Sequence, residues 1–261
     1  MPCAEPVASS LRLEGITKRF GGYDALAGVS TNVLPGRIHA LIGPNGAGKT
    51  TLLNIASGLM RPSEGRLYFG GIEYTGNRAH EILKMGIARN FQHVRLFREL
   101  SVIENVMVGR HARMKSDLIS AIFASPFSPP LREREARDHA RELLAFVGLG
   151  ARTGVAPADL TLVEQRRVEI ARALATGPSL LMLDEPAAGM NPVEVTELRA
   201  LILAIRARGI TVMLIEHHMR LVMSTSDTVT VLGAGRVIAE GTPEAMRRDP
   251  AVTTAYMGHA A

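Results

Sequence analysis

Residues 43–50 read Gly-Pro-Asn-Gly-Ala-Gly-Lys-Thr, which is the G-x-x-x-x-G-K-[ST] spacing of a phosphate-binding loop. An apolar run at 38–42 precedes the loop and predicts a buried strand, and the run at 50–57 suits a helix. In such a loop the glycines let backbone N–H groups turn around a phosphate, and the positive charge of Lys49 lies close to the β and γ phosphate oxygens. The Thr50 hydroxyl can bind Mg²⁺, and the helix dipole points its positive end at the same phosphates. These residues predict a nucleoside triphosphate site.

The composition fits a globular protein and argues against a nucleic-acid partner. A length of 261 residues with 46% hydrophobic residues suits one large domain, or a core with a subdomain. A net charge of +5 suits nucleic acid, anionic lipid or an acidic partner. However, the arginines are spread along the chain and alternate with glutamate, as at 132–137, and only 4% of the residues are aromatic. We therefore expect no nucleic-acid partner.

The ends and the single cysteine bear on the compartment. Cys3 is the only cysteine, so a disulfide framework and a thiolate metal site are excluded and a reducing cytosol fits. Residues 1–10 lack the charge and the apolar core of a signal peptide, which predicts a flexible N-terminal tail. No apolar run approaches 18 residues, so we expect no transmembrane segment and, if the chain serves a membrane, docking on another subunit.

Apolar patterning predicts an α/β chain with a helical insertion. The first part alternates short apolar runs with glycine and proline, which predicts strands at 11–16, 25–33, 38–42 and 66–68. Apolar spacings of three and four then predict helices at 101–113, 131–147 and 163–176. Continuous apolar runs at 180–183 and 212–215 predict parallel strands that are covered on both faces, and 229–237 predicts a hairpin. We expect an ATP-binding core from 11–92 and 171–261, with an antiparallel β part and a C-terminal helix, and a helical subdomain from 93–170.

One helix has both ends written in the sequence. Asn191 is the expected N-cap, Pro192 takes the first helical position, and Glu194 completes a capping box. Gly209 is the expected stop.

Two predicted strands end in residues that suit phosphate chemistry. Asp184 and Glu185 follow a buried strand, at the carboxyl end where parallel sheets form ligand crevices. Asp184 can hold Mg²⁺ through water, and Glu185 can act as general base on a water that attacks the γ-phosphorus. His217 follows the next apolar strand at a similar place, where its imidazole can bond a γ-phosphate or the attacking water.

Two further residues are candidates. Gln92 carries a neutral amide able to sense water or Mg²⁺ where the β-rich part meets the helical insertion. Phe20 precedes a Gly-Gly turn and can stack on a purine, although a core position explains it equally well.

Taken in order, these residues resemble the ATP-binding subunit of ABC transporters, and the resemblance covers residues 11–258. It implies ATP and Mg²⁺ as cofactors, Phe20 as the adenine-stacking aromatic, Gln92 as the Q-loop residue and His217 as the switch histidine. Asp184 and Glu185 correspond to Walker B, and Mg²⁺ is expected on Thr50, Gln92 and Asp184. The Walker A contacts to the nucleotide are expected from Gly43, Pro44, Asn45, Gly46, Ala47, Gly48, Lys49, Thr50 and Thr51.

Three stretches, 86–105, 183–192 and 249–258, resemble more narrowly the high-affinity branched-chain amino-acid importers. The implied fold is a P-loop NTPase of L shape, with a RecA-like core, an antiparallel β part and a helical subdomain that contacts the permease. The implied partners are a second ABC ATPase subunit, two integral-membrane permease subunits and, indirectly, a periplasmic or extracellular solute-binding protein. The implied location is the cytoplasmic face of the bacterial inner membrane, reached through the permease.

The chain departs from the family at the signature L-S-G-G-[QE], which reads Leu-Thr-Leu-Val-Glu at 160–164. In the family this loop caps the γ-phosphate of ATP bound by the other subunit. Thr161 can still donate a hydroxyl and Glu164 keeps the last position, but the branched side chain of Val163 would crowd a phosphate and disfavours φ above zero. The usual D-loop Asp is Asn191, and the usual Asp after the switch histidine is His218. We expect a weakened site where this signature completes a partner's ATP, and an active site at this chain's own Walker motifs.

Other functions stay open at this point. One alternative is a soluble ABC protein of DNA repair or translation. Proteins of that class carry long coiled-coil insertions or two ATP cassettes in one chain, and this sequence has neither. A nucleotide-binding regulator with little turnover is suggested by the altered signature, although Glu185 and His217 argue against full loss of catalysis. Small-molecule kinases with a P-loop would not need Gln92 and His217 at these places. The solute is also open between branched-chain amino acids, other amino acids, amides and urea.

Overall fold

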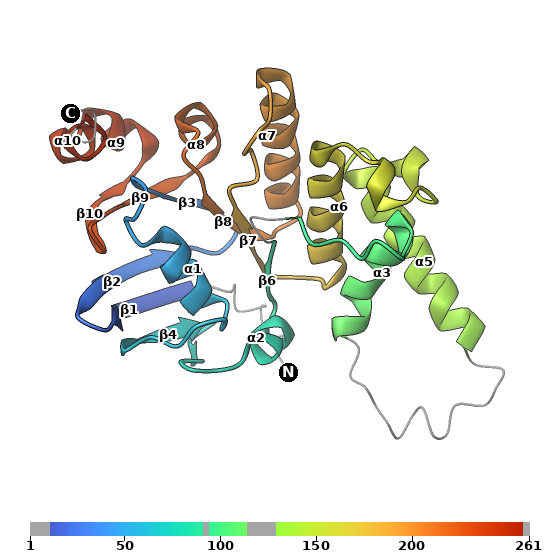
Figure 1. The fold of residues 1–261 in the computed structure, drawn as a ribbon, viewed down its shortest axis with the longest axis horizontal. Helices are drawn as coiled ribbons and strands as arrows, with labels where there is room; N and C mark the ends of the chain where they lie inside the picture. Colours follow the sequence, from blue (N-terminus) through green and yellow to red (C-terminus); the bar gives the residue numbers. More distant parts are fainter. Residues whose placement is uncertain (1–10, 91–93, 114–128, 258–261) are drawn as a thin grey trace, which may run out of the picture. The chain divides into compact units, whose positions relative to one another are not determined.

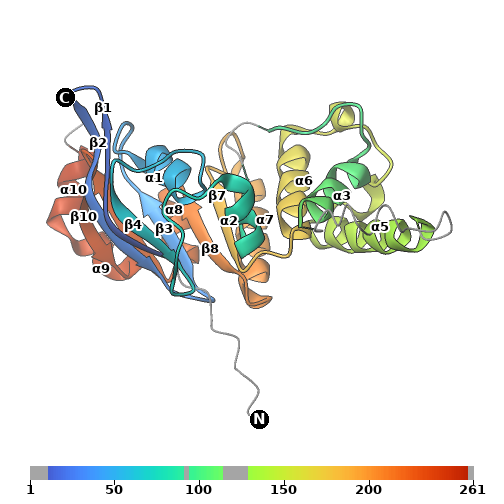
Figure 2. The same ribbon diagram turned by 90° about the horizontal axis from the view of Figure 1, so that it is seen from below.

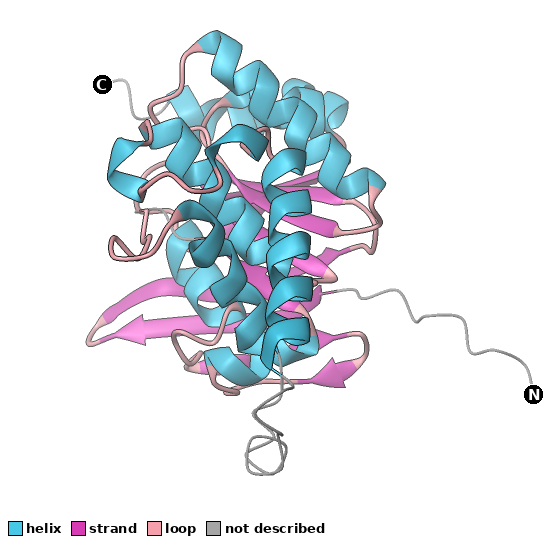
Figure 3. Cartoon of the chain, turned by 90° about the vertical axis from the view of Figure 1, so that its right-hand side faces the viewer, coloured by secondary structure: helices cyan, strands magenta, loops and turns pink. Residues whose placement is uncertain are grey.

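The computed structural model describes residues 11–90, 94–113 and 129–257. They form two compact units, one from the chain up to Arg89 and from Ser179 onwards, the other from Asn90 to Pro178. All the strands that the structure describes, drawn in magenta in Figure 3, belong to the first unit. The sequence predicted the boundaries between the ATP-binding core and the helical subdomain at 92/93 and 170/171. The second of these positions lies inside the helix α6 (Leu162–Ala175).

The first unit begins with an antiparallel sheet, whose strands run side by side in Figure 2. Its order is β2-β1-β4-β5, with bounds β1 (Leu11–Phe20), β2 (Tyr23–Val33), β4 (Glu64–Phe69) and β5 (Ile72–Glu73). Along β1, Leu11 and Leu13 are buried and Arg12 is exposed, as alternating side chains of a one-sided sheet require. The strands predicted at 11–16, 25–33 and 66–68 are confirmed, with longer bounds.

A six-stranded sheet in the order β10-β9-β3-β8-β7-β6 forms the centre of the first unit. Its strands are β3 (Ile38–Ile42), β6 (Ile87–Arg89), β7 (Leu180–Asp184), β8 (Thr211–Ile215), β9 (Thr228–Gly233) and β10 (Arg236–Gly241). All pairs are parallel except the β9–β10 hairpin, which the sequence predicted. Every residue of β3, β7 and β8 is buried, because both faces of this sheet are covered.

Two hydrophobic clusters lie on the two faces of this sheet. On one face Leu41 joins Leu52 and Leu53 of α1 (Lys49–Ala56) and the inner residues of the antiparallel sheet. On the other face Ala40 and Ile42 pack with residues of α8 (Met219–Thr225), α9 (Pro243–Arg248) and α10 (Pro250–Met257). Figure 1 shows these helices. The helices of this unit besides α1 are α2 (Ala79–Met85), α7 (Pro192–Ala207), α8 (Met219–Thr225), α9 (Pro243–Arg248) and α10 (Pro250–Met257).

The predicted capping box of α7 is confirmed. The side-chain oxygen of Asn191 accepts hydrogen bonds from the N–H groups of Val193 at 2.9 Å and Glu194 at 3.1 Å. The Glu194 carboxylate in turn accepts the Asn191 N–H at 2.8 Å.

In the part of the second unit that the structure describes, three helices pack on one another through buried apolar side chains. They are α3 (Val102–Arg113), α5 (Pro129–Phe146) and α6, and two short 3₁₀ turns at Gly150–Arg152 and Pro157–Asp159 lie between α5 and α6. On α3, a Cβ at Gly109 would collide with the carbonyl oxygen of Arg172, so glycine is what lets α3 approach α6. The three predicted helices are confirmed. None of the helices in the described part of the chain combines the length and the hydropathy needed to cross a bilayer.

A buried polar cluster connects strand β2 of the antiparallel sheet with strands β3, β9 and β10 of the central sheet. His39 on β3 is 1% exposed, and its Nε2 lies 2.7 Å from the Thr230 hydroxyl oxygen. The hydroxyls of Thr230 and Thr31 both donate to one carboxylate oxygen of Glu240, each at 2.6 Å. Burial lowers the pKa of His39 from 6.5 to about 4, and the Glu240 charge offsets part of that effect.

This shift predicts a loss of stability in mild acid. Below pH 6.5 the unfolded chain takes up a proton at His39 that the folded chain accepts only near pH 4. The free energy of unfolding should therefore fall as the pH drops through that window, by up to roughly 3 kcal/mol. His39→Gln should be less stable at pH 7 but lose less between pH 7 and 4.5, measured as urea unfolding midpoints. His80→Gln, at an exposed position, is the control. An equal drop in wild type and His39→Gln would contradict this account.

Candidate nucleotide-binding site

The register of the parallel sheet brings three chain segments to one edge. Asp184 at the end of β7 pairs with Ile215 at the end of β8, and Ile215 pairs with Leu41 of β3. The segments that leave these strands therefore start side by side: the loop at 43–48, the residues after Asp184, and those at 216–218. This carboxyl edge is where parallel sheets bind ligands.

The phosphate loop needs glycine at defined places. Gly43, Gly46 and Gly48 have φ values of 152°, 79° and 100°, which other residues rarely adopt. A Cβ at Gly43 would collide with the carbonyl oxygen of Leu232, and one at Gly48 would lie 2.7 Å from the carbonyl oxygen of Ala25. Close backbone approach thus fixes glycine at both ends of the loop.

Lys49 begins α1 and folds back over the loop. Its ammonium donates to the carbonyl oxygens of Gly43 at 2.7 Å and Pro44 at 2.9 Å. Burial lowers the pKa of Lys49, and the nearby charges of Glu185 and Asp184 offset part of that effect. An anion bound here would compensate the same buried charge. Thr50 is exposed in the first turn of α1, and Thr51 is half-buried.

Asp184 is held by an arginine that no sequence pattern had singled out. Its carboxylate, 2% exposed, accepts a hydrogen bond from Arg89 at 2.8 Å. The other terminal nitrogen of the Arg89 guanidinium donates to the side-chain oxygens of Asn54 at 2.7 Å and Ser57 at 3.0 Å, both near the end of α1. Arg89 therefore links β6, β7 and the helix that follows the phosphate loop. Its only signal in the sequence was a charged residue that closes the short apolar run Ile87-Ala88.

Glu185 has an unusual backbone. Its φ is 46°, in the left-handed region that non-glycine residues seldom occupy. Its N–H donates to the carbonyl oxygen of Ile215 at 2.9 Å, and its own carbonyl accepts the Ala188 N–H at 3.2 Å. Strain of this kind in the Glu185 backbone occurs where the surroundings enforce a functional geometry.

His217, two residues after the end of β8, is exposed.

The structure separates the remaining candidates. Phe20 is 48% exposed at the end of β1 with the Lys18 ammonium 5.2 Å from its ring centre, so the alternative of a core position is wrong. Adenine stacking stays a prediction. Gln92 lies outside the described residues. Asp184 and Thr50 offer the hard oxygen donors that Mg²⁺ takes together with phosphate oxygens, so these residues fit the expected ion.

The signature segment forms the start of α6. Thr161 is its N-cap: the Thr161 hydroxyl oxygen accepts the Glu164 N–H at 3.2 Å, and the Glu164 carboxylate accepts the Thr161 N–H at 2.9 Å. That backbone bond and the charge of Arg152, 3.3 Å away, lower the pKa of Glu164. Val163 lies inside the helix without a positive φ. The expected backbone conflict is therefore absent at Val163, and only side-chain crowding remains.

Comparison with known proteins identifies the family. A family model described as "ABC transporter" matches residues 26–188, and one described as "Branched-chain amino acid ATP-binding cassette transporter" matches residues 236–261. The chain is 43% identical over 251 residues to the high-affinity branched-chain amino acid transport ATP-binding protein BraF of Pseudomonas aeruginosa. It is also 43% identical to LivG of Escherichia coli, which has the same description, and each match covers 96% of this chain and 98% of the relative.

Solved structures agree with these matches. The ADP conformation of the ATP-binding cassette MJ1267 superposes with a TM-score of 0.84 at 34% identity, covering 96% of this chain and 99% of that one. A dimeric post-hydrolysis state of the cassette MJ0796 with ADP and Pi gives 0.75 at 27% identity, covering 89% and 98%. The phosphate loop lies at the carboxyl edge of the sheet, the first family model matches more than half of this chain, and the relatives match it nearly from end to end. The chain therefore belongs to the ABC transporter family, as one of its ATP-binding cassettes.

Proposed function

We propose that this chain binds and hydrolyses ATP to drive an importer of branched-chain or similar amino acids through separate permease subunits. One observation carries the ATPase role. At the carboxyl edge of the sheet, Lys49 of the phosphate loop lies close enough to Glu185 and Asp184 for their negative charges to act on its ammonium group. The names of the relatives and the matched C-terminal segment at 236–261 support the substrate class.

Each side chain has one proposed task. Lys49 and the backbone of 43–51 bind the phosphates, while Thr50 and Asp184, with Gln92, hold Mg²⁺, which neutralises phosphate charge when bound. Glu185 accepts the proton of the attacking water. His217 bonds the γ-phosphate from the end of β8. Phe20 stacks on the adenine.

The helical unit suits the permease contact. After residue 94 the chain is fixed on α6, since the Arg95 N–H donates to Glu169 at 2.8 Å and its carbonyl accepts a bond from Arg172 at 2.7 Å. The buried side chain of Asn105 holds Phe97 through both its N–H and its carbonyl. Phe97 itself is 49% exposed, and a fixed, exposed aromatic ring is well suited to anchor an interface. The permease would hold the subunit at the cytoplasmic face of the inner membrane, paired with a second ATPase subunit.

Exchanging two residues should separate binding from hydrolysis. Lys49→Ala should lower ATP affinity at least about tenfold, because the loop loses its cation. Glu185→Gln should keep the affinity and lower turnover about 10²- to 10⁴-fold, because the amide cannot accept the proton of the water. Titration with a fluorescent ATP analogue and phosphate release measure the two effects, and Glu73→Gln on the exposed strand β5 is the control. Equal loss of binding in both variants would remove Glu185 from the base role.

A permease contact through Phe97 predicts site-specific crosslinks. A photoreactive residue at Phe97 should crosslink to permease loops in the assembled transporter, whereas one at Ile72 in the antiparallel sheet, also exposed, should not. Protection confined to the C-terminal residues on assembly would contradict this surface.

The signature allows a further test. Val163→Gly should raise ATP hydrolysis in the assembled transporter that carries Glu185→Gln in this chain, because only the site completed by this chain's signature then turns over. ATP binding by the isolated chain should not change. Val163→Ala is the matched variant, since it removes most of the crowding without the roughly 1 kcal/mol helix cost of glycine. If neither variant raises the rate, Val163 does not impair the signature.

A further inference from the structure

Glu216, the residue after β8, is a buried carboxylate with three backbone donors. Its side chain is 0% exposed. One oxygen accepts the Ala187 N–H at 2.7 Å, and the other accepts the N–H groups of His217 at 3.1 Å and His218 at 3.2 Å. Burying a carboxylate is costly unless such bonds compensate it, so its position is strongly determined.

These bonds join the segments that leave two neighbouring strands. Ala187 follows Glu185 by two residues, and the Glu185 N–H is already bonded to Ile215 of β8. The short segment from 185 to 187 is thus tied at both ends, at one end to Ile215 of β8 and at the other to Glu216, the residue after β8. Because Glu185 keeps a left-handed backbone, which is costly for a residue other than glycine, ties of this kind are what a stable conformation requires.

We propose that Glu216 is a positioning residue that fixes the Glu185 carboxylate and the His217 imidazole relative to each other. This inference rests on the proposed roles of those two residues in hydrolysis. Glu216 does not contact nucleotide in this account and acts only through the backbone of the two segments.

Glu216→Gln removes the bridge with little change in shape. An amide has one acceptor oxygen and one donor nitrogen. Whichever way it turns, its NH₂ group meets either the Ala187 N–H or the N–H groups of His217 and His218. One side of the bridge is therefore lost, and a buried donor is left facing another donor.

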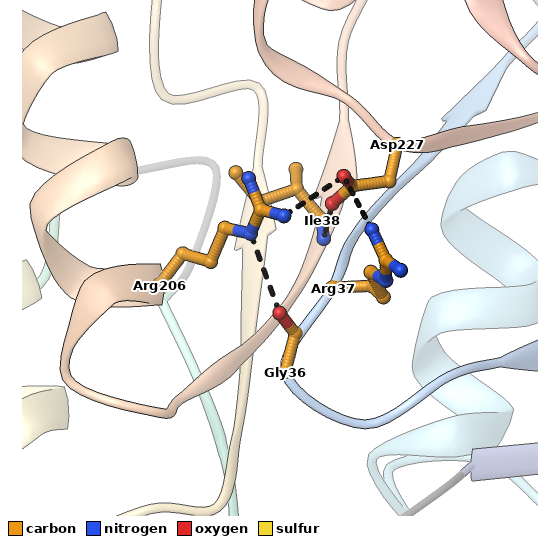
Figure 4. A network of polar contacts seen from close by, with 5 residues as sticks. All are labelled: Gly36, Arg37, Ile38, Arg206 and Asp227. Carbon is orange, nitrogen blue, oxygen red and sulfur yellow. Dashed lines mark hydrogen bonds and ion pairs between the residues drawn. The ribbon is translucent and has the colours of Figure 1, made fainter.

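The same sheet offers a matched control at its opposite edge. Figure 4 shows Asp227 at the amino end of β3, where its carboxylate accepts the Ile38 N–H at 2.8 Å. The carboxylate also binds Arg206 at 3.0 Å and Arg37 at 3.2 Å, and Arg206 reaches the carbonyl oxygen of Gly36 at 3.3 Å. Asp227→Asn makes the same chemical change far from the phosphate loop.

The experiment compares the two variants in the full-length chain. Glu216→Gln should lower kcat about ten- to a hundredfold, the size expected for a misplaced reacting group, with KM and nucleotide affinity within about threefold of wild type. Asp227→Asn should lower the urea unfolding midpoint and leave kcat within about twofold. In wild type the amide hydrogens of Ala187, His217 and His218 should be protected from exchange, and in Glu216→Gln at least one side should lose that protection.

The outcomes separate this inference from the proposed function. If Glu185→Gln abolishes turnover but Glu216→Gln leaves kcat unchanged, the positioning role is wrong and the hydrolytic roles stand. If Glu185→Gln retains turnover, the proposed roles themselves are wrong. If Glu216→Gln does not fold, exchange in the wild type decides, because unprotected amides at 187, 217 and 218 would exclude the bridge.

Discussion

The site depends on the register of three parallel strands. Leu41, Ile215 and Asp184 lie opposite one another on β3, β8 and β7. A shift of one residue in any pair would turn that strand's side chains to the opposite face and withdraw one of the three segments that follow. The register is held by burial on both faces, since Leu41 packs toward α1 while Ala40 and Ile42 pack toward the helices on the other side. Core packing and site geometry are therefore set by the same residues.

Buried polar groups then set the fine geometry at this edge. Arg89 connects Asp184 to α1, and Glu216 connects the segment after β7 to the one after β8. A buried ion pair is weak support for stability, because desolvation offsets much of the attraction. Its value here is positional: Arg89 fixes the direction of a carboxylate that is proposed to face Mg²⁺. Lys49 is desolvated in the same region, so a bound polyphosphate would relieve a cost that the fold already carries.

In the second unit, the segments of interest are the start of α6 and the chain after residue 94. The altered signature still begins a well-formed helix, because Thr161 and Glu164 cap each other. That reciprocal capping uses both side chains locally, so in the proposed pairing with a second subunit the partner's phosphate would meet exposed Leu162 and half-buried Val163 beside them. Substitution of the two family glycines has therefore kept the helix and changed its surface.

The local sequence determined the phosphate loop, the strand that precedes it, the paired carboxylates and the capping box at Asn191, because each depends on spacing within a few residues. The short elements α2, β5, β6, α8 and α10 were not predicted, since their patterns are too brief to show a period. Only the tertiary structure showed that Arg89 meets Asp184 across 95 residues of sequence and that Glu216 meets Ala187 across 29. It also showed that Phe20 is exposed and that Val163 lies in ordinary helical backbone. Periodicity and spacing report what a residue does to its own neighbours, whereas the partner of a buried charge is chosen by strand order and register, which the complete sheet sets.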